Sequence, residues 1–139
     1  MPPPPLGGLL ETSIYVADIG RAAHFYRTVL GLTPMFESDR LIAFDAGAKR
    51  VLLVFQSGRS TEDMRFDEGL VPGLDGSGPV HIAFAIAPDH LDAWRGHLAG
   101  AGIGIKGEMR WPRGGHSLYF DDPDGNLLEI ATPGLWPNY

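Results

Sequence analysis

The sequence predicts an α+β fold built from two copies of one module, each a strand, a helix and three further strands. Three observations lead to this prediction. The local patterns give the same order of elements in residues 9–56 and in residues 79–133. Each half contains one set of apolar residues at helical spacing that ends at a glycine. The second half also carries an Asp-Pro-Asp-Gly turn between two apolar runs, which is typical of a hairpin. An element order that recurs in this way indicates an internal repeat.

The first module begins with a strand-like segment over residues 9–16, which alternates poorly, with Leu10, Ile14 and Val16 on one face. Asp18 is a suitable N-cap for a helix over residues 19–30, and Gly31 stands where a left-handed C-cap belongs. Within that helix the apolar side chains Ala22, Phe25, Tyr26 and Val29 fall at helical spacing. The remaining three strands of the module are expected over residues 32–37, 41–46 and 50–56.

Three segments lie outside the modules. Residues 57–78 are rich in Gly, Asp, Glu and Pro with little periodicity, which favours a linker or a lid loop. Part of it, around residues 64–70, is expected to form a short helical turn or an interface segment. Residues 1–8 are expected to be an extended tail, which has neither the basic start nor the apolar run of a signal peptide, and residues 134–139 a C-terminal tail.

The second module repeats the first. A strand over residues 80–86 is followed by Pro88 at the start of a helix, which the glycines 100 and 102 end. Leu91, Trp94, Leu98 and Ala101 share one face of this helix. Three strands then follow over residues 103–110, 116–121 and 127–131. The turn Asp122–Gly125 joins the last two, because proline pre-sets its backbone and glycine accepts positive φ.

Composition excludes several functions. The chain has 139 residues, a formal net charge of −6 and no clustered Lys or Arg, so nucleic-acid binding is not expected. It has no cysteine, which excludes disulfides, thiolate ligands and a cysteine nucleophile. Its apolar runs are too short to span a bilayer. A soluble, cytoplasmic protein is therefore expected, and any metal site must be built from His, carboxylate and water.

Overlaying the two modules pairs residues that chemistry also singles out. Glu11 at the start of the first strand overlays His81, and Leu53 in the last strand overlays Glu129. Three of these four positions carry a side chain that can ligate a metal. A carboxylate inside the apolar strand of Glu129 is costly unless it is paired or bound to a metal, and His81 is the first candidate partner.

Several motifs together resemble those of the vicinal oxygen chelate superfamily, which includes glyoxalase I, fosfomycin-resistance proteins, extradiol dioxygenases and bleomycin-resistance proteins. The motifs are Val16-Ala17-Asp18, the segment Phe25–Leu32, His81-Ile82-Ala83-Phe84, and the segment Asp122–Glu129 with its Asp-Pro-Asp-Gly-Asn-x-x-Glu pattern. The resemblance implies curved mixed sheets of paired βαβββ modules around a cleft, and usually a homodimer.

The resemblance also implies a site. By position it assigns Glu11, His81 and Glu129 as metal ligands, with Leu53 where glyoxalase I has a glutamate. That departure counts against ordinary glyoxalase I activity. Glu11 stands where dioxygenases and fosfomycin-resistance proteins usually have a histidine, which counts against those two activities.

Two carboxylates and one imidazole suit Mn²⁺, Fe²⁺, Ni²⁺ or Zn²⁺, and three ligands leave positions for water or a chelating substrate. Such a metal acts as a Lewis acid on a substrate oxygen or activates water. Glu129 and Glu11 are therefore also candidate catalytic residues, and Glu11 alternatively serves as a general base. For single residues the alternatives are a hydrogen-bonded core histidine at 81 and an arginine-paired carboxylate at 129.

Candidate substrate contacts lie beside this site. Arg113 and Trp111 belong to the connection before the last hairpin, Tyr119 offers a hydroxyl group, and Leu53 offers an apolar lining. The alternative for Trp111 is a side chain that covers the core.

Two classes of function remain open at this point. The first is a metal-dependent lyase, isomerase, dioxygenase or epoxide-opening transferase that acts on a small substrate through vicinal oxygens. The second is a metal-free protein that binds a small molecule or antibiotic, as in the bleomycin-resistance branch.

Overall fold

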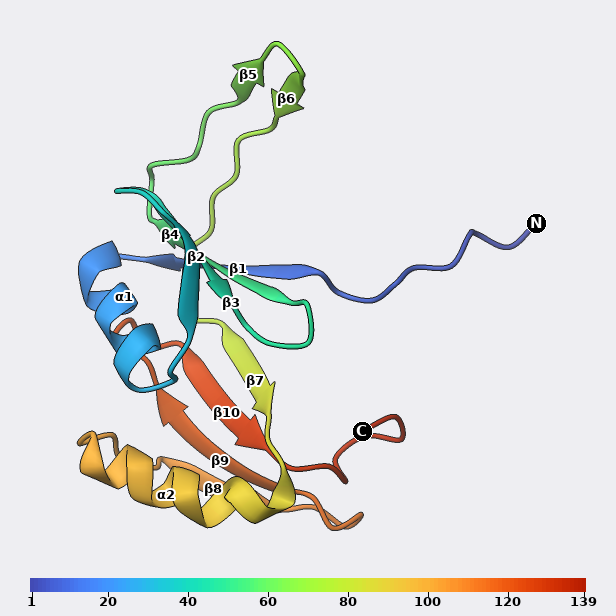
Figure 1. The fold of residues 1–139 in the computed structure, drawn as a ribbon, viewed down its shortest axis with the longest axis vertical. Coiled ribbons are helices and arrows are strands. Elements are labelled where there is room, and N and C mark those ends of the chain that lie inside the picture. The colour runs from blue at the N-terminus through green and yellow to red at the C-terminus, as the bar shows by residue number, and fades with distance from the viewer. The chain divides into compact units, whose positions relative to one another are not determined.

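The computed structural model describes residues 1–139, which form two compact units, Met1–Ser77 and Gly78–Tyr139. Each unit contains one four-stranded mixed sheet and one α-helix that lies against it (Figure 1). The α+β fold class with two βαβββ modules is thereby confirmed.

The first unit has its elements in the expected order. They are β1 (Glu11–Val16), α1 (Ile19–Thr28), β2 (Thr33–Glu37), β3 (Leu41–Asp45) and β4 (Val51–Gln56). The sheet order is β1-β4-β3-β2, with β1 parallel to β4 and the other pairs antiparallel. Side chains from α1 and from one face of the sheet make the core, which includes the fully buried Ile14, Val16, Tyr26, Phe44 and Val54.

Polar groups at the strand–helix corner explain where α1 begins. The Asp18 carboxylate accepts a hydrogen bond from the backbone N–H of Arg21 at 3.0 Å, which is an N-cap. From β4, the Gln56 side chain accepts from the N–H of Ile19 at 2.9 Å and donates to the carbonyl of Ala17 at 2.8 Å. The amide of Gln56 thereby fastens the corner between β1 and α1 to the end of β4.

The segment after β4, which belongs to the first unit, does not form the helical turn expected around residues 64–70. It contains a short hairpin of β5 (Met64–Phe66) and β6 (Gly69–Val71), drawn away from the four-stranded sheet of its unit in Figure 1. Gly69 has a φ of +154°, which side-chain-bearing residues rarely adopt and which a helix does not contain. The glycine therefore reverses the chain where helical propensity alone would have continued it.

The second unit repeats the first. Its elements are β7 (His81–Ala85), a 3₁₀ turn (Pro88–His90), α2 (Leu91–Gly100), β8 (Gly107–Arg110), β9 (His116–Asp121) and β10 (Leu127–Ala131). The sheet order is β7-β10-β9-β8, with β7 parallel to β10. The strand expected over residues 103–110 begins only at residue 107, and the helix expected over residues 19–30 ends at residue 28. Neither helix has the length and apolar character needed to cross a membrane.

The Asp-Pro-Asp-Gly turn aligns both neighbours of β10. Asp122 is 5% exposed, and its Oδ1 accepts from the backbone N–H groups of Asp124 and Asn126, both at 2.9 Å. The Asn126 side chain donates to Asp122 Oδ2 at 2.8 Å and accepts from the N–H of Val80 at 3.0 Å. Because Val80 precedes β7, this amide holds the start of β7 in register with β10.

An ion cluster fastens α2 to its sheet. Arg95 of α2 donates to both carboxylate oxygens of Glu108 in β8, at 2.9 and 2.7 Å, and His116 Nε2 lies 2.5 Å from the same carboxylate. Hydrogen bonds from Arg95 and then from His116 lower the pKa of Glu108 to about 2. The cluster lies on the face of the sheet toward α2.

Candidate metal centre

The two units align their strands identically. In the first unit Glu11 pairs with Val51 and Ser13 with Leu53, and in the second unit His81 pairs with Leu127 and Ala83 with Glu129. Glu11 and His81 are therefore structural equivalents, as are Leu53 and Glu129. This is the correspondence that the sequence overlay predicts.

The side chain of Glu129 points away from α2. Its neighbours Leu128 and Ile130 are fully buried on the helix side, and side chains alternate along a strand. Glu129 therefore shares the opposite face with His81, and by the antiparallel pairing of β9 and β10 also with Tyr119 and Ser117.

His81 and Glu129 form a direct pair on this face. His81 Nε2 lies 3.1 Å from Glu129 Oε1. The Glu129 side chain is 6% exposed, whereas the His81 side chain is 48% exposed. The pair is thus anchored in the sheet at its carboxylate and open to solvent at its imidazole. It is neither a core histidine nor an arginine-paired carboxylate.

The backbone determines which nitrogen of His81 carries hydrogen. His81 Nδ1 lies 2.9 Å from the carbonyl oxygen of Leu127, and a carbonyl only accepts hydrogen bonds. Nδ1 must therefore be protonated, so in the neutral imidazole Nε2 holds a lone pair. That lone pair faces a carboxylate oxygen, and two acceptors at this distance need a proton or a cation between them.

The second oxygen of Glu129 is already engaged. Ser117 Oγ donates to Glu129 Oε2 at 2.5 Å, and Trp111 Nε1 donates to Ser117 Oγ at 2.8 Å. Sequence reasoning did not single out Ser117, although the turn at residues 122–125 sets a hairpin register that places it on the face of Glu129. Trp111, expected as a substrate contact or a cover for the core, thus contacts the residue that donates to Glu129.

Tyr119 lies beside the pair. Its ring centre is 6.2 Å from that of His81, and it pairs in register with Glu129. Burial, and after it the negative charge of Glu129, raise the pKa of the Tyr119 phenol above its ordinary value. The phenol therefore keeps its proton at neutral pH and is able to donate a hydrogen bond next to the pair.

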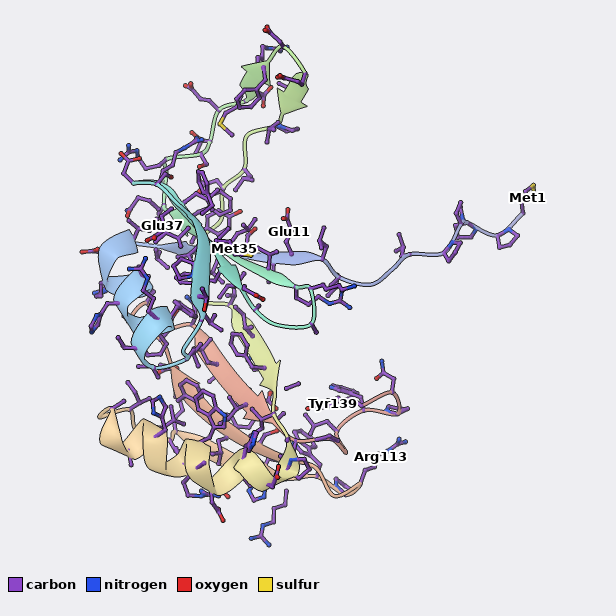
Figure 2. All side chains as sticks on the ribbon, viewed as in Figure 1. Met1, Glu11, Met35, Glu37, Arg113 and Tyr139 are labelled. Carbon is purple, nitrogen blue, oxygen red and sulfur yellow. The ribbon has the colours of Figure 1, made fainter.

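The other predicted site residues are one loop residue of this unit and two residues of the first unit. Arg113 is exposed in the loop between β8 and β9, and Glu11 is exposed at the start of β1 in the other unit (Figure 2). Leu53 is half-buried in β4. No group of three His or acidic side chains gathers by itself into a metal site. The membership of Glu11 in the ligand set therefore stays a prediction that depends on its equivalence to His81.

His81 and Glu129 fit a divalent metal ion. Metal bonds of about 2.0–2.2 Å at a right angle separate two neighbouring ligand atoms by roughly 3 Å, and Nε2 and Oε1 lie 3.1 Å apart. A protonated Nδ1 held by a carbonyl is also the usual support of a metal-binding histidine. Imidazole and carboxylate together are suitable ligands for Mn²⁺, Fe²⁺, Ni²⁺ or Zn²⁺.

Comparison with known proteins places the chain in a family. The sequence model of the Glyoxalase/Bleomycin resistance protein/Dioxygenase superfamily matches residues 8–130. The chain belongs to this superfamily. The resemblance inferred from its motifs is thereby confirmed.

Individual members of the superfamily are similar over nearly the whole chain. The metallothiol transferase FosB of Shouchella clausii is 30% identical over 132 residues, which cover 94% of this chain and 83% of that protein. The structure of a lactoylglutathione lyase from Agrobacterium tumefaciens has a TM-score of 0.86 and 29% identity, and covers 96% of this chain and 99% of that one.

A third member shares the fold at lower identity. The fosfomycin resistance protein FosX of Listeria monocytogenes, whose structure contains Mn(II) and a sulfate ion, has a TM-score of 0.66 and 22% identity. The match covers 91% of this chain and 90% of the FosX chain.

Proposed function

We propose that this member of the superfamily is a divalent-metal-dependent enzyme that acts on a small substrate through two vicinal oxygens. The observation that carries the proposal is the approach of His81 Nε2 to Glu129 Oε1, 3.1 Å apart, with a half-exposed imidazole beside a buried carboxylate. Names of similar proteins, a metallothiol transferase and a lactoylglutathione lyase, are enzyme names and support the same class.

In the proposed site His81 and Glu129 hold the metal, and Glu11 is the third ligand or a general base. When bound, the metal supplies Lewis-acid chemistry by polarising a substrate oxygen. Tyr119 keeps its proton and donates to a substrate oxygen, and Leu53 leaves one side of the site apolar.

Glu129→Gln tests the proposal without disturbing the fold. The new amide is able to donate to His81 Nε2 and to accept from Ser117 Oγ, so both partners keep a hydrogen bond. We expect the variant to fold like the wild type, by circular dichroism, but to retain only background metal after incubation with Mn²⁺ and dialysis. Metal content is measured by mass spectrometry.

Glu108→Gln is the matched control. Glu108 also contacts a histidine, but Arg95 donates to both of its oxygens, so it has no lone pair directed at a metal. This variant should retain as much Mn²⁺ as the wild type. Wild-type protein without bound Mn²⁺ would place the protein in the metal-free binding class instead. Glu129→Gln with the full wild-type Mn²⁺ content would overturn the assignment of Glu129 as a metal ligand.

We also propose that the protein is a homodimer. The sheets end at open edge strands, and edge strand β2 exposes Met35 and Phe36 with 56% and 54% of their surfaces accessible. Exposed apolar edges are usually covered by a symmetric partner. Light scattering should return twice the 15.0 kDa mass of the chain, whereas the mass of a single chain would contradict the dimer.

A further inference from the structure

A row of hydrogen bonds runs behind Glu129, on the side away from His81. Trp111 Nε1 donates to Ser117 Oγ at 2.8 Å, and Ser117 Oγ donates to Glu129 Oε2 at 2.5 Å. Ser117 is fully buried and Glu129 is 4% exposed, so water does not substitute for either bond. The row joins the carboxylate to the loop between β8 and β9.

The direction of each bond in this row is determined by chemistry. An indole N–H donates and cannot accept, so Ser117 Oγ must be the acceptor of the Trp111 bond. The single hydroxyl hydrogen of Ser117 is then directed to Glu129 Oε2. This leaves Oε1 as the oxygen that faces His81 Nε2.

Trp111 is itself held in place by its loop. Its backbone N–H donates to the carbonyl of Gly115 at 2.8 Å, and its carbonyl accepts from the N–H of Gly114 at 2.9 Å. Gly114 has a φ of +97°, so this tight turn depends on glycine. The indole therefore approaches Ser117 from a closed turn at the end of β8.

We propose that Trp111 and Ser117 are positioning residues that orient the Glu129 carboxylate so that Oε1 alone is presented to the metal. The proposal rests on the proposed function, because it concerns the same metal. It assigns no contact with metal or substrate to either residue. A metal bound at Oε1 alters the charge on the Glu129 carboxylate, and the two hydrogen bonds transmit this change to Trp111. The Trp111 indole N–H therefore reports whether metal is bound.

Affinity for Mn²⁺ is the first test, measured by titration calorimetry on the full chain after removal of metal. Ser117→Ala should weaken Mn²⁺ binding by about 10- to 100-fold, the usual effect of removing a partner that supports a metal ligand. Trp111→Phe should weaken it less, because the Ser117 hydroxyl remains. The double variant should match Ser117→Ala, because Trp111 acts only through Ser117. Trp94→Phe, on α2, is the control and should leave Mn²⁺ affinity unchanged.

The second test is spectroscopic and uses diamagnetic Zn²⁺. The chain has three tryptophans, so its ¹⁵N–¹H spectrum holds three indole signals, and Trp111→Phe identifies the one that belongs to Trp111. This signal should shift when Zn²⁺ is added to the wild type and should stay in place in Ser117→Ala. A role of Ser117 in packing alone would not link the indole signal to the metal.

The outcomes separate this proposal from the proposed function. Wild-type protein that binds neither Mn²⁺ nor Zn²⁺ overturns both. Wild-type binding with an equal Mn²⁺ affinity in folded Ser117→Ala overturns the positioning role alone. Losses of affinity that add in the double variant overturn it too. If Ser117→Ala does not fold, Trp111→Phe decides. An unchanged Mn²⁺ affinity in Trp111→Phe, together with a wild-type Trp111 indole signal that does not shift when Zn²⁺ is added, overturns the positioning role.

Discussion

Asn126→Ala should destabilise the second unit, because one amide holds both the turn and the start of β7. Asn126 is 2% exposed, accepts from the N–H of Val80 at 3.0 Å and donates to Asp122 Oδ2 at 2.8 Å. Its removal leaves a backbone donor and a buried carboxylate oxygen without these partners. At about 1–3 kcal/mol for each of these two groups, the free energy of unfolding should fall by roughly 2–6 kcal/mol.

Tryptophan fluorescence in a urea titration measures this change selectively, because all three tryptophans lie in the second unit. Asn138→Ala is the matched control, since Asn138 is exposed in the C-terminal tail and should change the free energy by less than about 0.5 kcal/mol. Asn126→Asp keeps the acceptor for Val80 but sets a second carboxylate against Asp122, so it should destabilise at neutral pH as well. A loss below about 1 kcal/mol in Asn126→Ala, or a neutral Asn126→Asp, would refute this account of the turn.

Three further predictions use other parts of the molecule. The pKa of Glu108 is lowered to about 2 in the folded protein, below its pKa in the unfolded chain. The ionised carboxylate therefore stabilises the fold at any pH above the unfolded-state pKa, and this stabilisation is lost as pH falls toward 2. The urea concentration at the unfolding midpoint should therefore be lower for Glu108→Gln than for the wild type at pH 6, and the two midpoints should converge near pH 2. Tyr139→Phe should lower the free energy of unfolding by about 1 kcal/mol, measured by the same fluorescence titration, because the phenol donates to the carbonyl of Ala131 at 2.8 Å. Leu53→Glu should raise Mn²⁺ affinity in calorimetry, and Leu41→Ser added to it should raise the affinity further.

Much of the fold could be predicted from local signals. Asp18 as an N-cap and the Asp-Pro-Asp-Gly turn each determine backbone geometry within a few residues, and both are present. Gly31 has the expected left-handed φ of +68°, but the C-cap of α1 is Val29, two residues earlier. The repeated order of elements then predicted that both halves form the same βαβββ module, which the structure confirms. The hairpin of β5 and β6 was missed because its strands have three residues each, which is too short for alternation to be recognised.

The candidate site could be predicted only in part. The overlay of modules singled out His81 and Glu129 in the first and last strands of the second module, and the structure brings their side chains to 3.1 Å. The roles of Ser117 and Trp111 could not be inferred in the same way. A buried serine in an apolar strand is compatible with simple packing. Only the direction of its hydroxyl hydrogen shows whether the serine also donates a hydrogen bond to a carboxylate. The place of Glu11 depends on how the two units meet, which no local pattern encodes.

The difference between the two units explains why only the second carries a metal-competent pair. The antiparallel neighbours of Leu53 in β4 put Ala43 and Leu41 where the second unit has Tyr119 and Ser117 around Glu129. A carboxylate on this face needs a buried hydrogen-bond donor beside it, and the side chains of Ala43 and Leu41 contain no donor. Leu53→Glu alone would thus place a charge on this face with no hydroxyl to orient it. This is why its expected gain in Mn²⁺ affinity is modest unless Leu41→Ser supplies the donor.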